Sequence, residues 1–231
     1  MSKLEAVPAK ASKAHIRYRT QNGDIVPGVT TILNAVIAKP ALVKWANNLG
    51  LQGFDSSAYV DATARIGTCA HELVQEYLGG AIVDRKAYSP DEIDNAENAL
   101  ISFFSWEKMH GGKMETVHIE LPLVSESLLY GGTIDWYGKL DGKFWLVDFK
   151  TAKGLFPEHE YQVAAYYRLL KENGYPVDGV RLLRIGRTED EGFDDHIMSD
   201  YKLELGWNVF QSALSLYSTQ KEFASYAKIK L

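Results

Sequence analysis

The chain has 231 residues, of which 46% are hydrophobic and 24% are charged, and its formal net charge is −5. These values exclude a disordered or fibrous chain and allow one substantial hydrophobic core. No apolar run approaches the roughly 20 residues of a membrane helix, and residues 1–13 have no apolar segment typical of a secretory signal. The negative charge argues mildly against nucleic acid binding, because phosphate contacts need positive charge.

The N-terminal part predicts only small elements. Residues 15–20 alternate, and residues 21–24 contain an Asn-Gly pair, which together indicate a small hairpin. Thr30 or Thr31 is expected to cap a short helix, and Pro40 is expected to open another that ends near residue 50. We interpret residues 1–55 as an accessory part.

Residues 56–231 predict an α/β core (α+β mixed) with a central mixed sheet flanked by helices. Ser89 and Glu92 form a capping-box pattern with Pro90 at the first helical position. The expected helices span residues 57–78, 89–109, 157–173 and 203–226, and the expected strands span residues 114–124, 132–140, 143–149, 180–186 and 195–198.

A tight turn dominates the middle of this core. Asp141 and Gly142 separate two alternating segments, which predicts an antiparallel hairpin with a two-residue loop. Counting outward from that loop places Asp135 directly opposite Asp148, so both side chains share one side of the sheet, with Cβ atoms about 5 Å apart. Lys150 lies two residues beyond Asp148 and shares that side. The hairpin therefore predicts two carboxylates and one ammonium in one place.

Such a pair of carboxylates needs compensation, because opposed like charges destabilise a sheet and a buried unpaired charge is disfavoured. A cation such as Mg²⁺ takes oxygen ligands of this kind. We therefore expect Asp135 and Asp148 to bind a metal ion, with the backbone carbonyl of Phe149 as a further ligand. The alternative is a plain ion pair between Lys150 and Asp148, since Asp-x-Lys tripeptides are common.

Four segments between Gly67 and Tyr166 resemble motifs of the PD-(D/E)XK nuclease superfamily, specifically its RecB-type exonuclease branch, in the expected order. These segments are residues 67–78 with His71, residues 131–135 with Asp135, residues 147–151 with Lys150, and the pair Gln162 and Tyr166. They are similar to the group that contains the mitochondrial genome-maintenance exonuclease and small phage exonucleases. The proline of the family name is Ile134 here.

The resemblance implies a PD-(D/E)XK nuclease-like fold and a metal-dependent deoxyribonuclease, acting as an exonuclease on single-stranded DNA or DNA ends in phage or DNA repair and recombination metabolism. It implies Mg²⁺ or Mn²⁺ at His71, Asp135, Asp148 and the Phe149 carbonyl, with Lys150 and the two carboxylates in catalysis. One or two ions fit this ligand set. Substrate contacts are expected from Thr151, Gln162, Tyr166, Lys153 and Arg65, with Lys44 and Arg168 as further groove candidates.

Cys69 is the only cysteine, which excludes an internal disulfide and a four-cysteine iron–sulfur cluster of the kind some RecB-type relatives carry. We expect a cytoplasmic protein, in the host cytoplasm if it is viral. DNA is the expected partner, phage or host recombination proteins are further candidates, and no membrane is expected.

Alternatives stay open at this point. His71 on an apolar helix face fits a satisfied core histidine as well as a ligand, and Glu120 fits an exposed strand residue better than an extra acidic ligand. The whole chain also fits a structure-specific or restriction-type endonuclease. Two readings without catalysis are a DNA-binding module with a nuclease-like fold, and a structural protein in which Asp135, Asp148 and Lys150 form only an ion network.

Overall fold

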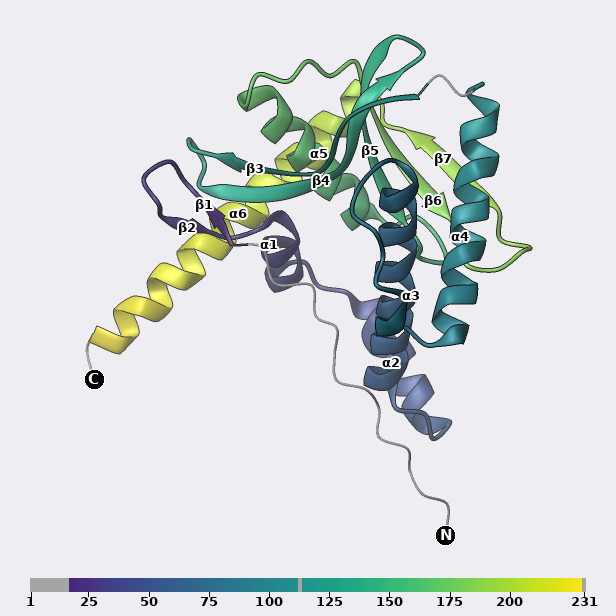
Figure 1. Ribbon diagram of the computed structural model, residues 1–231. Coiled ribbons are helices and arrows are strands. Elements are labelled where there is room, and N and C mark those ends of the chain that lie inside the picture. The colour runs from purple at the N-terminus through teal and green to yellow at the C-terminus, as the bar shows by residue number, and fades with distance from the viewer. Residues whose placement is uncertain (1–16, 112–113, 230–231) are drawn as a thin grey trace.

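The computed structural model describes residues 17–229 apart from 112–113, and a five-stranded mixed sheet with the order β3-β4-β5-β6-β7 lies at its centre (Figure 1). The strands are β1 (Tyr18–Arg19), β2 (Ile25–Val26), β3 (Met114–Ser125), β4 (Tyr130–Leu140), β5 (Lys143–Lys150), β6 (Gly179–Ile185) and β7 (Phe193–Ile197). The helices are α1 (Val29–Val36), α2 (Pro40–Leu51), α3 (Ser56–Tyr77), α4 (Pro90–Met109), α5 (Pro157–Glu172) and α6 (Asp200–Ile229), with a 3-10 turn at Arg85–Ala87. β5 and β6 are parallel, and the other neighbouring strands of the sheet are antiparallel. The mixed α/β architecture expected from the sequence is confirmed.

Local signals account for the start of α4 and for the central turn. The Ser89 hydroxyl accepts the Glu92 N–H at 3.3 Å, and the Glu92 carboxylate accepts the Ser89 N–H at 2.8 Å, so the capping box of α4 is confirmed. Asp141 and Gly142 have φ of 53° and 77°, the positive values that a two-residue hairpin loop of this type needs. The expected loop between β4 and β5 is therefore confirmed.

The ends of the chain depart from the expectations. α1 begins at Val29 after Gly28 with no side-chain cap, so the expected cap at Thr30 or Thr31 is wrong. The expected small hairpin is confirmed, because β1 pairs antiparallel with β2, but β1 covers only two residues, and residues 15 and 16 lie outside the described residues. α6 starts at Asp200, three residues before the expected start at residue 203, and its first turn carries that acidic residue, which favours a helix N-terminus.

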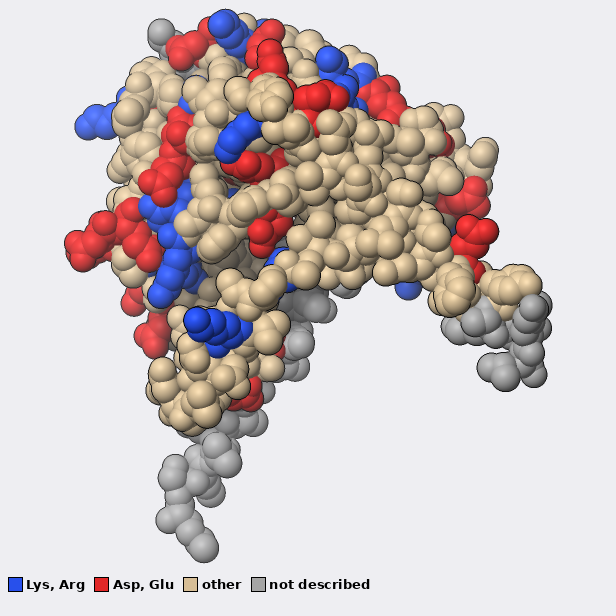
Figure 2. Space-filling model, turned by 180° about the vertical axis from the view of Figure 1, so that it is seen from behind, with Lys and Arg blue, Asp and Glu red and all other residues tan. Residues whose placement is uncertain are grey.

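The molecule has two projections, visible in Figure 1 and from behind in Figure 2. One consists of α2 and the start of α3, and the other is the C-terminal half of the 30-residue helix α6. No helix among the described residues is both long and apolar enough to cross a membrane.

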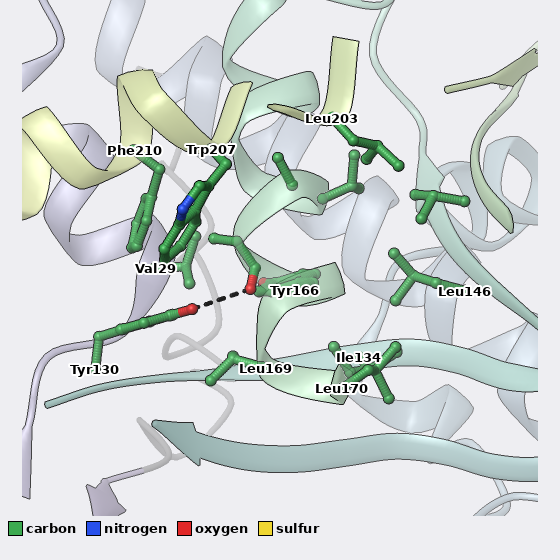
Figure 3. Packing of buried hydrophobic residues seen from close by; sticks show 14 of the residues in the cluster. Val29, Tyr130, Ile134, Leu146, Tyr166, Leu169, Leu170, Leu203, Trp207 and Phe210 are labelled. Carbon is green, nitrogen blue, oxygen red and sulfur yellow. Dashed lines mark hydrogen bonds between the residues drawn. The ribbon is translucent and has the colours of Figure 1, made fainter. Parts of the chain in front are cut away.

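Two hydrophobic cores lie on opposite faces of the sheet. α1, α5 and α6 pack on one face, where Tyr130, Trp207 and Phe210 meet (Figure 3), and the Tyr130 hydroxyl donates to the Ala165 carbonyl at 3.2 Å. α3 and α4 pack on the other face around Phe103. Since α1 belongs to the first core, part of the segment that we interpreted as accessory is packed against the sheet, and the division at residue 55 stays a prediction.

β4 changes face in its middle. Side chains two residues apart share one side of a regular strand, yet Ile134 packs in the first core and Trp136 in the second, so the strand is irregular at Asp135. β3 makes the same change on either side of Glu120, which has a φ of 50° and lies next to Asp135 in the register. The side chains of β3 and β4 thus switch between the two faces of the sheet at Glu120 and Asp135, and we call this position the break in the sheet. Irregularities of this kind, such as β-bulges, change the direction of nearby side chains.

Candidate active site

Asp135 lies at this break and connects β4 to β5 through its side chain. The ladder between the two strands follows the expected register as far as Trp136 and Val147, and then stops. There the Asp135 carboxylate accepts the backbone N–H of Phe149 at 2.9 Å. The expectation that Asp135 and Asp148 form a directly opposed ladder pair is therefore wrong, because β4 is irregular at Asp135 and the ladder ends at the preceding pair.

His71 reaches Asp135 from α3. Its Nδ1 lies 3.6 Å from Oδ2 of Asp135, and its ring meets the ring of Phe149 edge to face at a centroid distance of 6.1 Å. The His71 side chain is 21% exposed and lines a cavity, so it is not an enclosed core histidine. The structure therefore brings together His71 from a helix on one face of the sheet and Asp135 from the inner strand β4.

Asp148 and Lys150 form the second half of the cluster on β5. The Asp148 side chain is 1% exposed and is ion-paired with the Lys150 ammonium, while its Oδ1 accepts no hydrogen bond from a described residue. The pKa of Asp148 is raised from 3.8 to about 6, mainly because the group is buried. The Lys150 ammonium opposes this rise, and the nearby charge of Asp135 adds to it. A buried carboxylate with an unsatisfied oxygen is the kind of group that a cation stabilises.

Gln162 and Tyr166 approach the carboxylates from α5, on the opposite face to His71. The Gln162 amide donates to the Tyr166 hydroxyl at 2.8 Å, as one helical turn of spacing allows. Burial holds the pKa of Tyr166 well above its usual range, and the charges of Asp148 and Asp135 raise it further. Tyr166 therefore offers a protonated hydroxyl close to both carboxylates.

Three polar residues of this region were not expected from the sequence as site residues. Glu120 is partly buried and accepts a hydrogen bond from the Gln75 amide, so the expectation of an exposed glutamate is wrong. Gln75 lies one helical turn after His71, a spacing that would have indicated a shared face. The Tyr18 hydroxyl is hydrogen-bonded to the Thr133 hydroxyl at 2.9 Å. The two residues are far apart in the sequence, so no local sequence pattern could have predicted this contact.

A cavity of about 620 Å³ opens beside His71, between α2, α3 and the loop after β5. Thr151 and Lys153 line it, so the structure places these two expected substrate contacts next to the cluster. A Cβ at Gly67 would lie 2.8 Å from the Thr151 hydroxyl oxygen, so the glycine lets α3 approach the loop at that point.

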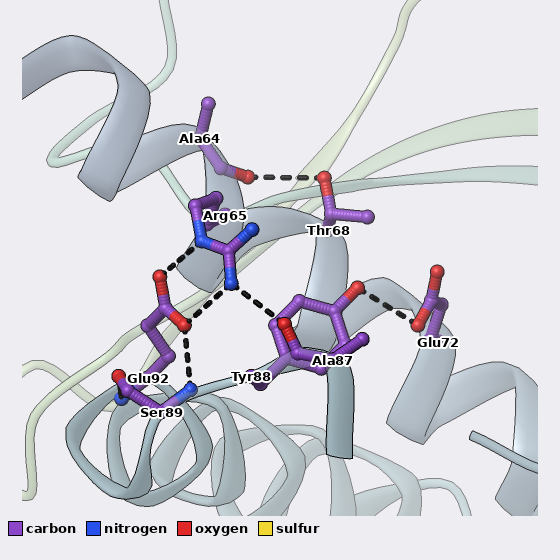
Figure 4. A network of polar contacts seen from close by, with 8 residues as sticks. All are labelled: Ala64, Arg65, Thr68, Glu72, Ala87, Tyr88, Ser89 and Glu92. Carbon is purple, nitrogen blue, oxygen red and sulfur yellow. Dashed lines mark hydrogen bonds and ion pairs between the residues drawn. The ribbon is translucent and has the colours of Figure 1, made fainter. Parts of the chain in front are cut away.

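Arg65 and Arg168 have structural partners instead of facing the cluster. Arg65 donates to the Glu92 carboxylate at 2.5 Å and 3.0 Å and to the Ala87 carbonyl at 2.7 Å, which ties α3 to the start of α4 (Figure 4). Arg168 is ion-paired with Glu204 and thus joins α5 to α6. The expected phosphate contact of Arg65 finds no support in this geometry, because its guanidinium is already engaged.

The residues fit a divalent cation in part. Two ligand atoms that each lie about 2.1 Å from one ion can be at most about 4.2 Å apart, and His71 and Asp135 meet this condition at 3.6 Å. Asp148 supplies the unsatisfied oxygen. However, no group of three or more His, Cys, Asp or Glu side chains within the described part of the chain is already arranged to hold an ion. The Phe149 carbonyl as a ligand stays a prediction.

No family model and no curated protein matches the sequence. Among solved structures, a protein from Eubacterium rectale named "Putative exonuclease" is similar at 12% identity and a TM-score of 0.47, over 66% of each chain, which is just under two thirds. A structure of a protein named SSO0001 is similar at 14% identity and a TM-score of 0.31, over 67% of this chain and 74% of that one. Both likenesses are too weak to bear on function.

Proposed function

We propose that this protein is a metal-dependent DNA nuclease of the PD-(D/E)XK type, an exonuclease that acts on single-stranded DNA or DNA ends. One observation supports the proposal above all: His71, Asp135, Asp148 and Lys150, from two strands and a helix, converge at the break in the sheet. An ion network without catalysis would not need a buried carboxylate with an unsatisfied oxygen at its centre.

His71, Asp135 and Asp148 would hold Mg²⁺ or Mn²⁺, with the Phe149 carbonyl as a further ligand. Imidazole suits transition metals better than Mg²⁺, so Mn²⁺ should support activity at least as well. When bound, the cation would polarise the scissile phosphate and lower the pKa of a bound water. The hydrogen bond from the Phe149 N–H holds Oδ2 of Asp135, the oxygen that lies toward His71.

The chain's own groups position the reactants for in-line attack of water on phosphorus. The Lys150 ammonium lies against Asp148, where it can orient the water and offset negative charge that develops on the phosphate. Gln162 and Tyr166 offer hydrogen-bond donors on the α5 side. Thr151 and Lys153 would contact the phosphates of the strand from the cavity side. No covalent intermediate is required.

The test is a cleavage assay on labelled single-stranded, duplex and circular DNA with EDTA, Mg²⁺ or Mn²⁺. We expect cleavage only with a divalent metal, and loss of at least 100-fold in rate for Lys150→Ala, the scale of general acid–base contributions. The matched control is Lys139→Ala, because Lys139 is a half-exposed lysine on β4 that pairs with Glu115 at 3.6 Å. A Lys150→Ala variant that cuts at the parent rate refutes the proposal.

Circular DNA separates the proposal from its nearest rival. An exonuclease leaves a covalently closed circle intact, whereas an endonuclease of the restriction or structure-specific type opens it. Binding of DNA without cleavage under every metal condition would instead assign the fold to a non-catalytic DNA-binding module.

A further inference from the structure

α2 is an unusual helix for a folded protein, because none of its 12 residues is buried. An isolated helix of about this length is marginally stable in water, and most helices are stabilised by an apolar face packed on a core. Leu42 of α2 is 49% exposed, and the facing side chain of Tyr59 on α3 is 46% exposed. Both line the cavity beside the proposed active site, so the uncovered apolar surface is a wall of that cavity.

Three aromatic rings line this cavity from three separate segments. Trp45 comes from α2, Tyr59 from α3 and Phe156 from the loop before α5. The Trp45 and Tyr59 rings are 5.5 Å apart at an interplanar angle of 65°, and Phe156 is 47% exposed. Exposed aromatic rings from different segments around one space are typical of surfaces on which nucleobases stack.

The charge of the cavity is opposite to that of the whole chain. The chain contains 30 acidic residues and has a net charge of −5. The described residues that line the cavity include no Asp or Glu, but they include Lys153 and Arg187. The Nε of Arg187 is buried and has no hydrogen-bond partner among the described residues. Figure 2 shows Lys and Arg side chains where the projection of α2 and α3 meets the body, with Asp and Glu side chains beside them. The cavity therefore suits an anionic ligand.

We propose that this cavity binds unpaired nucleobases of single-stranded DNA, with Trp45, Tyr59 and Phe156 as stacking platforms and with Lys153 and Arg187 on the phosphates. This inference rests on the proposed nuclease function and specifies its substrate. Aromatic rings beside cations fit a chain that carries a π-face and a phosphate at every step. A duplex fits less well, because its base faces are already stacked on each other.

The position of the cavity connects it to the proposed chemistry. His71 belongs both to its wall and to the cluster with Asp135, and Thr151, which directly follows Lys150 in the chain, also lines the wall. A strand that stacks its bases on Tyr59 and Phe156 therefore has its backbone within reach of His71. The aromatic residues would be binding residues that set strand preference, because they touch the substrate away from the reacting phosphate.

The experiment measures binding of fluorescent 12-nucleotide oligothymidylate to the full chain in EDTA, where no metal-dependent cleavage occurs. The comparison ligand is an abasic sugar–phosphate oligomer of the same length and charge. We expect the parent protein to bind oligothymidylate more tightly than the abasic oligomer and more tightly than a 12-base-pair duplex. Equal affinity for the abasic and thymidine oligomers, or tighter binding of the duplex, would overturn the proposal.

Variants locate the base-dependent binding. Tyr59→Ala and Phe156→Ala should each weaken oligothymidylate binding about 5- to 150-fold, the range measured when a stacking ring is removed, with no change for the abasic oligomer. Tyr59→Phe keeps the ring and should bind like the parent. Tyr201→Ala is the matched control, because Tyr201 is 73% exposed on α6 and does not line the cavity. Parent-like binding by both alanine variants, or an equal loss in Tyr201→Ala, contradicts the inference.

Melting temperatures verify that these variants are folded, as expected for exposed side chains. Cleavage of the same oligothymidylate with Mn²⁺ separates the two proposals. If the protein cleaves oligothymidylate but binds it no more tightly than the abasic oligomer, only the stacking inference is refuted. Base-dependent binding without cleavage removes the nuclease function and leaves the cavity as a binding site for single strands.

Discussion

The Asp135 carboxylate accepts the backbone N–H of Phe149 at 2.9 Å, at the point where the ladder between β4 and β5 has ended. A side chain thus does what a strand carbonyl does elsewhere in the sheet. The same oxygen lies 3.6 Å from His71, so one carboxylate both closes the sheet and faces the proposed metal position. Asp135 therefore has an observed structural role and a proposed catalytic role, and substitutions can separate the two.

Asp135→Ala should lower the free energy of unfolding by about 1–3 kcal/mol, because the Phe149 N–H loses its acceptor. Asp135→Asn keeps an oxygen acceptor and should retain most of the stability. Urea denaturation measures both. Mn²⁺ should raise the melting temperature of the parent protein, but it should not raise that of either variant. A parent-like Mn²⁺ shift in Asp135→Asn would remove Asp135 from the ligand set.

The buried Asp148 predicts a specific pH dependence of stability without metal. Its pKa rises from 3.8 to about 6 in the folded protein, so the folded state holds a proton that the unfolded state releases. Stability should therefore decrease as the pH rises from about 4 to about 6, by on the order of 3 kcal/mol for this group alone. The difference between the parent and Asp148→Asn, measured by urea denaturation in EDTA, isolates the effect. A constant difference across this window contradicts the prediction.

Cleavage should depend on pH in the opposite direction. A divalent cation needs the ionised form of Asp148, so protonation competes with the metal. We expect the rate at limiting Mn²⁺ to decrease as the pH falls below about 6, the pKa of Asp148 in the metal-free protein. Raising the Mn²⁺ concentration should move the midpoint to lower pH. A midpoint that stays fixed at every Mn²⁺ concentration is inconsistent with Asp148 as a ligand.

Gly67→Ala should affect function more than stability. The new Cβ would lie 2.8 Å from the Thr151 hydroxyl oxygen, which must move away, while alanine in a helix gains up to about 1 kcal/mol over glycine. The single-turnover cleavage rate should decrease about as much as it does in Thr151→Val. The rate of the double variant should be no lower than that of either single variant. Additive losses in this double-mutant cycle would show that Gly67 acts elsewhere.

Two basic residues expected to contact phosphate should behave differently. Arg65→Ala should lower stability by about 1.5–3 kcal/mol, because Arg65 ties α3 to Glu92, and should leave the salt dependence of DNA binding unchanged. Lys153→Ala should leave stability within about 0.5 kcal/mol and lower the slope of log affinity against log salt by about 1. Denaturation and fluorescence titrations at several salt concentrations measure both. Interchanged outcomes would mean that Arg65 is the phosphate contact.

Local rules predicted the parts of the fold whose cause is local. The turn at Asp141 and Gly142 and the capping box at Ser89 each depend on a few neighbouring residues, and both are as expected. The turn also fixed the register of β4 and β5, which is why the approximate place of Asp135 and Asp148 could be inferred. The same spacing argument predicted that Gln162 and Tyr166 share a helix face.

The remaining features arise from contacts between distant segments. The direct pairing of Asp135 with Asp148 was wrong because counting assumes a regular ladder, and nothing near Asp135 signals the turnover of the strand. The partial burial of Glu120 depends on Gln75 of α3, 45 residues away. The cavity needs α2, α3 and the loop at Phe156 to assemble, so no single stretch of sequence predicts it.

The turnover of β4 has a consequence for how the protein responds to change. β4 contributes side chains to both hydrophobic cores, and Asp135 lies at the position where the strand changes from one core to the other. The position of its carboxylate therefore depends on the packing of both helical layers. A small change in the size of a remote core side chain such as Phe103 or Phe210 should lower the proposed cleavage rate before it unfolds the protein.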